Sequence, residues 1–121
     1  MRRGAQGAVR RLEAQRFRPG FLSDALGRYE QFLRRPGRWL YVVLEDCECH
    51  DVFGSRDDLQ AMLDALPSAA RRELSRIVAR LDAEFERRTL PDPYASSWLT
   101  HHRSPSLPWW RRRLTVWWHE T

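Results

Sequence analysis

Residues able to transfer protons and to stabilise negative charge lie close together in the last third of the chain. They are Tyr94, His101, His102 and Arg103. Two histidines can act as general acid and base while a guanidinium stabilises an oxyanion, which is the chemistry of small metal-free ribonucleases of the toxin type. Prolines interrupt this region, so no regular element is expected to fix the four side chains. We therefore favour a solvated polar tail and keep RNA cleavage as an alternative function.

Cys47 and Cys49 are the only cysteines of the chain. Two thiolates on one face of a strand could share Zn²⁺, with His101, His102 or His119 completing a tetrahedral site. Zinc sites usually place two or more residues between paired cysteines, and no second pair is present. We therefore predict neither a metal nor another cofactor, and a Zn-stabilised regulatory protein is a further alternative.

Acidic residues cluster in the middle of the chain, and carboxylates in a cluster can hold Mg²⁺ for phosphodiester chemistry. The cluster comprises Glu45, Asp46, Glu48, Asp51, Asp57 and Asp58. Nucleases of this kind often add a lysine, and this chain contains none. Asp57 and Asp58 are expected in the first turn of a helix capped by Ser55, where negative charge stabilises the helix. The pattern favours solvated turns over a catalytic metal cluster.

Tryptophan and arginine are concentrated near the end of the chain, where residues 109–118 read WWRRRLTVWW. In a strand, alternate residues share a face, so one face would pack on the core and the other would present indole beside guanidinium. Such a face can stack on bases, anchor a protein partner or lie at a membrane interface. The alternative is a segment that closes the core. The candidate binding residues are Trp109, Arg111, Arg112, Arg113 and Trp117.

Charge is distributed unevenly along the 121 residues, of which 31% are charged. Residues 1–40 carry ten Arg and three acids, residues 41–70 one Arg and seven acids, and residues 71–121 ten Arg and six acids. All 21 cationic residues are Arg, a bias typical of a GC-rich, bacterial genome, which weakens the net charge of +5 as an indication of nucleic-acid binding. Internal compensation between the acidic middle and the basic flanks is the favoured interpretation.

Several classes of protein lack their signatures here. No apolar run approaches the length of a membrane span, and the basic start leads into no apolar signal segment, so a cytoplasmic location is expected. The chain also lacks a nucleophile elbow, a P-loop and a dinucleotide-binding fingerprint, so an enzyme is the less favoured interpretation. Nothing in the sequence indicates an oligomeric state.

The elements that must position these residues follow from hydrophobic periodicity and turn residues. We expect helices over about 22–35, 56–66 and 68–89, packed on a small sheet of two or three strands built from 39–45 and a short return at Val52 and Phe53. The fold class is therefore α+β and mostly helical. In the third helix, Arg80 and Glu84 are spaced for an ion pair. Residues 1–20 are expected as a basic arm, 21–90 as the core domain and 91–121 as a Pro/Trp/Arg-rich tail.

The third helix supplies the predicted core. Leu74, Ile77, Val78, Leu81 and Phe85 recur at helical spacing and should form one cluster with Trp39, Tyr41 or Val43. Taken together, the sequence predicts a non-enzymatic binding protein that acts through an Arg/Trp surface on a protein or nucleic-acid partner.

Overall fold

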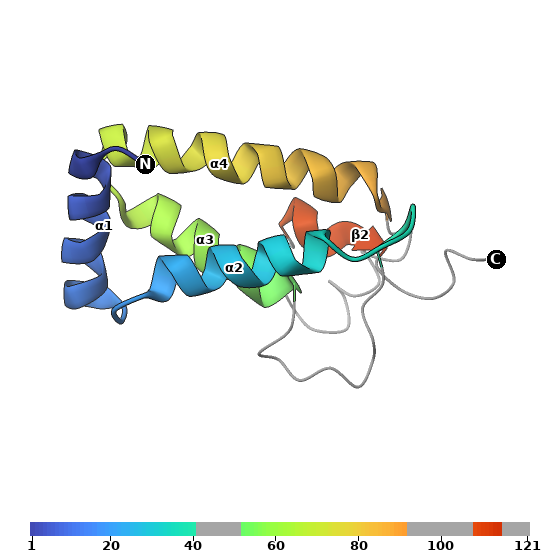
Figure 1. The fold of residues 1–121 in the computed structure, drawn as a ribbon, viewed down its shortest axis with the longest axis horizontal. Helices are drawn as coiled ribbons and strands as arrows, with labels where there is room; N and C mark the ends of the chain where they lie inside the picture. Colours follow the sequence, from blue (N-terminus) through green and yellow to red (C-terminus); the bar gives the residue numbers. More distant parts are fainter. Residues whose placement is uncertain (41–51, 92–107, 115–121) are drawn as a thin grey trace.

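A computed structural model of the chain describes residues 1–40, 52–91 and 108–114. Within these residues the protein is helical, with a short 3₁₀ turn and one two-stranded antiparallel ladder (Figure 1). The elements are α1 (Arg3–Arg16), α2 (Phe21–Leu33), α3 (Val52–Ala65), α4 (Ser68–Arg87), β1 (Leu90–Pro91), η2 (Trp109–Arg112) and β2 (Arg113–Leu114).

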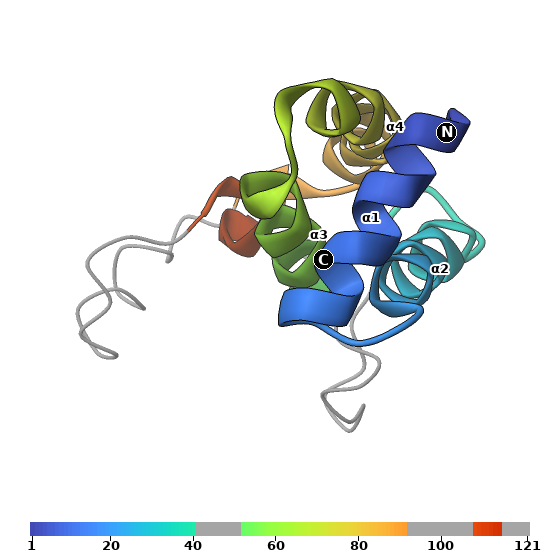
Figure 2. The same cartoon turned by 90° about the vertical axis from the view of Figure 1, so that its left-hand side faces the viewer.

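Three helices form a bundle and the fourth crosses its end. Helices α2, α3 and α4 pack on one another, and Figure 2 shows α1 lying across them with contacts to α2 and α4. The start of α1 lies beside the start of α4, and its end leads directly into α2 (Figures 1 and 2). The two helices α1 and α4 therefore adjoin at one end of the molecule and run in different directions.

The expected α+β fold is wrong for the described residues. Four helices are present where three were expected, and the ladder of β1 and β2 is only two residues long in each strand. Val52 and Phe53 do not form a return strand, because they begin α3. Most of the strand expected over 39–45 lies outside the described residues.

Helix α3 begins about a turn earlier than the sequence predicts. The predicted start is too late because the buried side of this helix contains polar residues. Val52, Leu59 and Met62 share the buried side, but the positions between them are Ser55 and Arg56, which are 0% and 5% exposed. These two residues make the apolar pattern look interrupted in the sequence. Ser55 is also not the helix cap, since its Oγ donates to the Val52 carbonyl oxygen at 2.8 Å from within the helix.

The core is drawn from all four helices. Tyr29, Leu59, Leu74 and Phe85 are almost completely buried, and Leu40, which follows α2 in the sequence, is 0% exposed. Other buried apolar residues of the core are Val78 from α4 and Ala5, Ala8, Val9 and Leu12 from α1.

The core prediction holds only in part. On α4, Leu74, Val78 and Phe85 are buried, whereas Ile77 and Leu81 are half-buried. Trp39 is likewise half-buried, and both Tyr41 and Val43 lie outside the described residues. Ile77 and Leu81 therefore lie at the edges of the buried stripe of α4, which is narrower than its sequence suggests.

The N-terminal segment contributes directly to the packing. Residues 3–16 of the expected basic arm form α1, and its single acidic residue, Glu13, is only 6% exposed. The Glu13 carboxylate accepts hydrogen bonds from the backbone N–H groups of Leu22 at 2.8 Å and Gly20 at 3.4 Å. Without Glu13 these N–H groups at the start of α2 would have no partner within the helix, so Glu13 caps the next helix. Gly20 has φ +81°, a conformation that favours glycine at this turn.

Arginines cap the ends of several helices, and Arg71, Arg88 and Arg113 are examples. The Arg71 guanidinium donates to the Leu66 carbonyl oxygen at 2.8 Å, just after α3. Arg88, only 6% exposed, donates to carbonyl oxygens at and beyond the end of α2, beginning with Leu33. Arg113 donates to carbonyl oxygens at the end of α4 at 2.9 and 2.7 Å. Cations at these positions satisfy terminal carbonyl groups and complement the helix dipole.

Candidate functional site

In the described part of the Trp/Arg segment, the expected strand is limited to Arg113 and Leu114, and the residues before them dock on the bundle. Residues 115–118 lie outside the described residues. Residues 109–112 form the 3₁₀ turn η2, which packs beside α3 (Figure 1). Trp110 is 7% exposed, and its indole N–H donates to Asp57 Oδ1 at 2.7 Å. The Arg56 guanidinium lies 4.1 Å from the centre of the same ring. Trp110 is therefore part of the core.

The other candidate binding residues of this segment also make internal contacts. Trp109 is partly buried and its ring centre lies 6.1 Å from that of Phe85. Arg111 pairs with Asp57, donating from Nε at 3.1 Å and also from a terminal nitrogen. Arg113 donates from Nε to Thr89 Oγ1 at 2.9 Å.

Not every candidate of the segment has a described position. The side chain of Arg112 and the whole of Trp117 lie outside the described residues. The structure thus brings Trp109, Arg111 and Arg113 together against α3 and α4 and gives each of them an internal partner.

A buried polar network lies next to this segment. Asp82 on α4 accepts from the Tyr29 hydroxyl at 2.7 Å and from Arg56 Nε and a terminal nitrogen at 2.9 and 3.0 Å. Burial raises the pKa of Tyr29 far above its ordinary value, and the hydrogen bond to Asp82 raises it further. The network joins α2, α3 and α4. Each of its three side chains is hydrogen-bonded to another member, so the network links the three helices structurally.

The predicted catalytic and metal-binding residues are not brought together in the described part of the chain. Tyr94, His101, His102 and Arg103 lie outside it, as do Cys47, Cys49 and His119. So do four members of the acidic cluster, Glu45, Asp46, Glu48 and Asp51.

Two acidic residues of that cluster are described, and both are bound to other side chains of the protein. Asp57 binds Trp110 and Arg111, and Asp58 pairs with Arg28 at 2.8 Å. Among the residues with a described position, no three His, Cys, Asp or Glu side chains are grouped so that they could hold a metal ion.

A second set of arginines has no acidic partner within residues 1–40, 52–91 and 108–114, and all of its members are exposed. We call this set the α1–α4 arginine surface. It comprises Arg3, Arg10, Arg11 and Arg16 on α1 and Arg72, Arg76 and Arg80 on α4. Helix α1 presents no acidic side chain to solvent, because Glu13 is turned inward to cap α2.

Two adjoining hollows connect the two helices of this surface. One, of about 430 Å³, lies between α1 and the start of α4 and has Arg2, Arg11 and Glu73 in its lining. The other, of about 350 Å³, lies along α4 and is lined by Arg76 and Arg80 together with the same Arg2 and Glu73. Glu73 is already paired with Arg2, with 3.7 Å between Oε1 and Nε. Because Arg2 balances the charge of Glu73, the two hollows together keep a net positive charge from the remaining arginines.

Along α4 the unpaired arginines form a regular row. Arg72, Arg76 and Arg80 are four residues apart, which is about 6 Å for each step along a helix. The ion pair expected between Arg80 and Glu84 is absent from the observed contacts, because the Glu84 carboxylate binds Arg87 at 2.6 Å instead. The hydrogen bond from Arg87 also lowers the pKa of Glu84. A cation that precedes its acid by four residues is the weaker orientation of such pairs.

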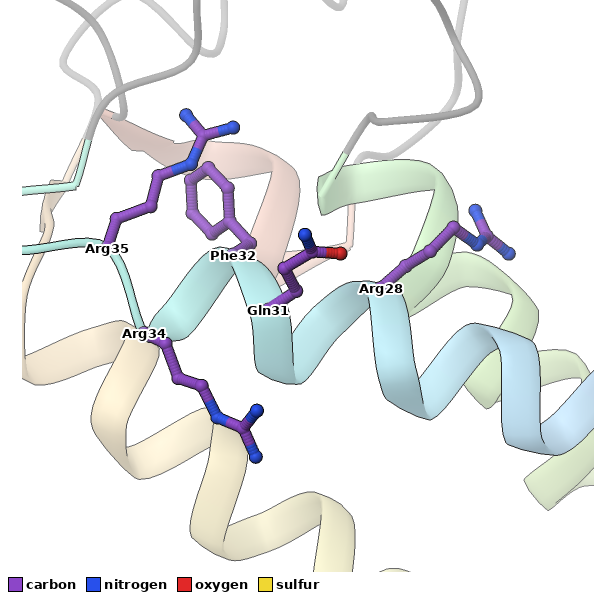
Figure 3. Close-up of a pocket in the computed structure, with 5 residues that line it drawn as sticks. All are labelled: Arg28, Gln31, Phe32, Arg34 and Arg35. Carbon is purple, nitrogen blue, oxygen red and sulfur yellow. The ribbon is translucent and has the colours of Figure 1, made fainter.

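A third hollow, of about 320 Å³, lies on α2 and is lined by Arg28, Gln31, Phe32, Arg34 and Arg35 (Figure 3). Arg28 is held by Asp24 and Asp58, at 3.1 and 2.8 Å. The Arg35 guanidinium stacks over the Phe32 ring, 4.8 Å from its centre. Figure 3 shows the Arg34 side chain pointing away from Arg28 and Arg35. These guanidiniums do not converge on one point, so this hollow is a weaker candidate for an anion site.

Sequence reasoning missed the α1–α4 arginine surface for a clear reason. It assigned α1 to an arm, and it paired Arg80 with Glu84. One signal was available: Arg72 and Arg76 have no acid three or four residues away except Glu73, which precedes Arg76. The inward position of Glu13 leaves no such signal, because it depends on how α1 packs against α2.

Comparison of the chain with protein-family models, curated proteins and solved structures found no match. None of the described helices is long and apolar enough to span a membrane. The functional argument therefore starts from the geometry of the α1–α4 arginine surface.

Proposed function

We propose that this protein is a non-enzymatic binding protein whose α1–α4 arginine surface binds nucleic acid. The observation that carries the proposal is that seven exposed arginines on two adjoining helices lack an acidic partner within the described residues. A guanidinium is always charged and presents a planar set of donors that matches phosphate oxygens. Unpaired guanidiniums concentrated on two adjoining helices attract polyanions.

A nucleic-acid partner fits this surface better than a protein partner. Protein interfaces are anchored by exposed aromatic or apolar residues that become buried on binding. Among the described residues the exposed large hydrophobic ones are Met1 and Leu90, and Trp110 is already in the core. Met1 lines the hollow along α4, but arginines outnumber it on the surface, so the main attraction is electrostatic, which is the main source of affinity for a phosphate backbone.

The arginine bias of the sequence does not explain this arrangement. A compositional bias raises the number of arginines but does not determine which of them find acidic partners. Elsewhere in the described chain arginines are paired or cap helices, as for Arg28, Arg56 and Arg88. The absence of partners is concentrated on α1 and α4, and this concentration supports a role in binding.

The test measures binding of fluorescently labelled DNA and RNA by anisotropy at several salt concentrations. The variant Arg72→Gln/Arg76→Gln/Arg80→Gln should bind more weakly, and the slope of log affinity against log salt should flatten by about one unit for each arginine lost. The parent protein should bind at low salt. Absence of binding by the parent would overturn the proposal.

A matched control removes the same charge elsewhere. Arg18, Arg34 and Arg87 are exposed but paired with acids, and replacing all three by Gln lowers the net charge by the same amount. This control should retain most of the salt slope. Equal losses in both triple variants would mean that net charge, and not this surface, drives binding. Cleavage of the RNA that disappears on His102→Ala would contradict a non-enzymatic role.

A further inference from the structure

We infer that the α1–α4 arginine surface binds double-stranded nucleic acid through its phosphate backbones, with little preference for base sequence. This inference rests on the proposed function and specifies its partner. It follows from three features of the surface: the absence of aromatic side chains, the different directions of the two helices, and the small size of the residues between the arginines.

Helices α1 and α4 present no exposed aromatic side chain on which a base could stack. Helix α1 contains no aromatic residue, and the one in α4, Phe85, is 1% exposed. Proteins that bind single strands combine a basic groove with aromatic platforms, and each stacked base contributes about 1–3 kcal/mol. Without stacking, nothing offsets the conformational entropy that a flexible strand loses on binding. A duplex is already ordered and also carries the denser array of phosphates.

The arginines follow two directions. On α4 they form a row of about 12 Å from Arg72 to Arg80, and on α1 Arg3 and Arg10 lie about 10 Å apart along a helix that crosses the end of the bundle (Figure 2). One strand cannot follow both rows without a sharp bend. The two backbones of a duplex present phosphates on either side of a groove, so each row can contact a different backbone.

Small residues lie between the arginines of α4. Ser75 and Ala79 are exposed and too short to reach base edges within a groove. They allow close approach of the phosphate backbone, and contacts to phosphate carry no direct sequence information. The surface is therefore expected to distinguish duplex from single strand and to discriminate poorly between sequences.

The experiment compares two DNA duplexes of about 20 base pairs and unrelated sequence with one of their unpaired strands, by anisotropy at low salt. The duplexes should bind about tenfold more tightly than the strand and within about threefold of each other. An RNA duplex of the same length forms a second arm. Vesicles of phosphatidylserine and phosphatidylcholine form a third, in which no binding is expected, because the surface lacks an apolar face for insertion.

Two triple variants test the two-row geometry. Arg3→Gln/Arg10→Gln/Arg11→Gln and the α4 triple variant should each weaken duplex binding and bring it closer to the single-strand value. Circular dichroism verifies that each variant is folded. The Arg18/Arg34/Arg87 triple Gln variant should keep the preference for duplex.

The outcomes separate this inference from the proposed function. Equal or tighter binding of the single strand would overturn the duplex inference and leave nucleic-acid binding intact. A difference of more than about tenfold between the two duplex sequences would overturn the absence of base readout. Failure to bind any nucleic acid, with or without binding to vesicles, would overturn the proposed function as well.

Discussion

Replacing Trp110 by Ala tests whether the Trp/Arg segment is a structural part of the fold. Trp110 is 7% exposed and packs in the core beside α3, where its indole N–H donates to Asp57 and its ring lies under the Arg56 guanidinium. The substitution removes all three interactions. It leaves residues 108–114 attached through Arg111, which pairs with the same carboxylate of Asp57.

The expected loss follows from the chemistry of the site. Truncating a buried Trp to Ala costs about 3–5 kcal/mol of unfolding free energy through lost burial and the cavity that remains. Asp57 keeps Arg111 as a partner, so its carboxylate is not left without a donor. The total should therefore lie near that range. For a domain of this size the melting temperature should fall by roughly 10–20 °C.

Urea unfolding followed by circular dichroism measures the effect, and Trp110→Phe is the matched variant. Phe retains most of the apolar volume but cannot donate to Asp57, so it should lose less stability than Ala. A loss below about 0.5 kcal/mol in Trp110→Ala would refute the reasoning. The indole would then contribute nothing to the core, and Trp109 and Arg111 would again be candidates for contact with a partner, as the sequence predicts.

Two further predictions concern buried polar groups. The raised pKa of Tyr29 means that the folded state holds the hydroxyl proton more tightly than the unfolded state. The contribution of Tyr29 to the free energy of unfolding is therefore complete below about pH 10 and declines above it by about 1.4 kcal/mol per pH unit. Urea unfolding between pH 9 and 11 should show this decline, and a parent protein with the same pH dependence as Tyr29→Phe would contradict it. Arg88→Lys should cost about 1–3 kcal/mol in the same assay, because one ammonium cannot reach all the carbonyl oxygens beyond α2 that Arg88 caps; an unchanged midpoint would show that this cap contributes no stability.

Hydrophobic periodicity was sufficient to locate three of the four helices. The helices expected at 22–35, 56–66 and 68–89 correspond to α2, α3 and α4, because long apolar stripes at helical spacing depend on local sequence. Helix α1 was missed as a core element because its buried side includes the small Ala5 and Ala8 and the charged Glu13. Alanine on a helix indicates neither burial nor exposure until a neighbouring helix is placed against it.

The errors at the start of α3 and in the Trp/Arg segment have a different origin. Ser55 and Arg56 are polar residues at buried positions, and their burial is possible because Ser55 bonds to the helix backbone and Arg56 pairs with Asp82. The partner of Arg111 is Asp57, which lies 54 residues away in the sequence. Spacing rules describe neighbours along the chain and cannot predict such long-range partners.

The use of arginine in this protein shows why pairing is more informative than net charge. Guanidinium is weakly hydrated and makes several directed hydrogen bonds, so it can be buried as Arg56 or used to cap a helix as Arg88. Such arginines add to the formal charge of +5 but are matched by internal acceptors. The charge that remains for a partner is carried by residues such as Arg72 and Arg76, which have no acidic partner because the neighbouring Glu73 is paired with Arg2. A comparison of variants with equal net charge therefore separates the two roles, because only the α1–α4 arginine surface should govern the dependence of binding on salt.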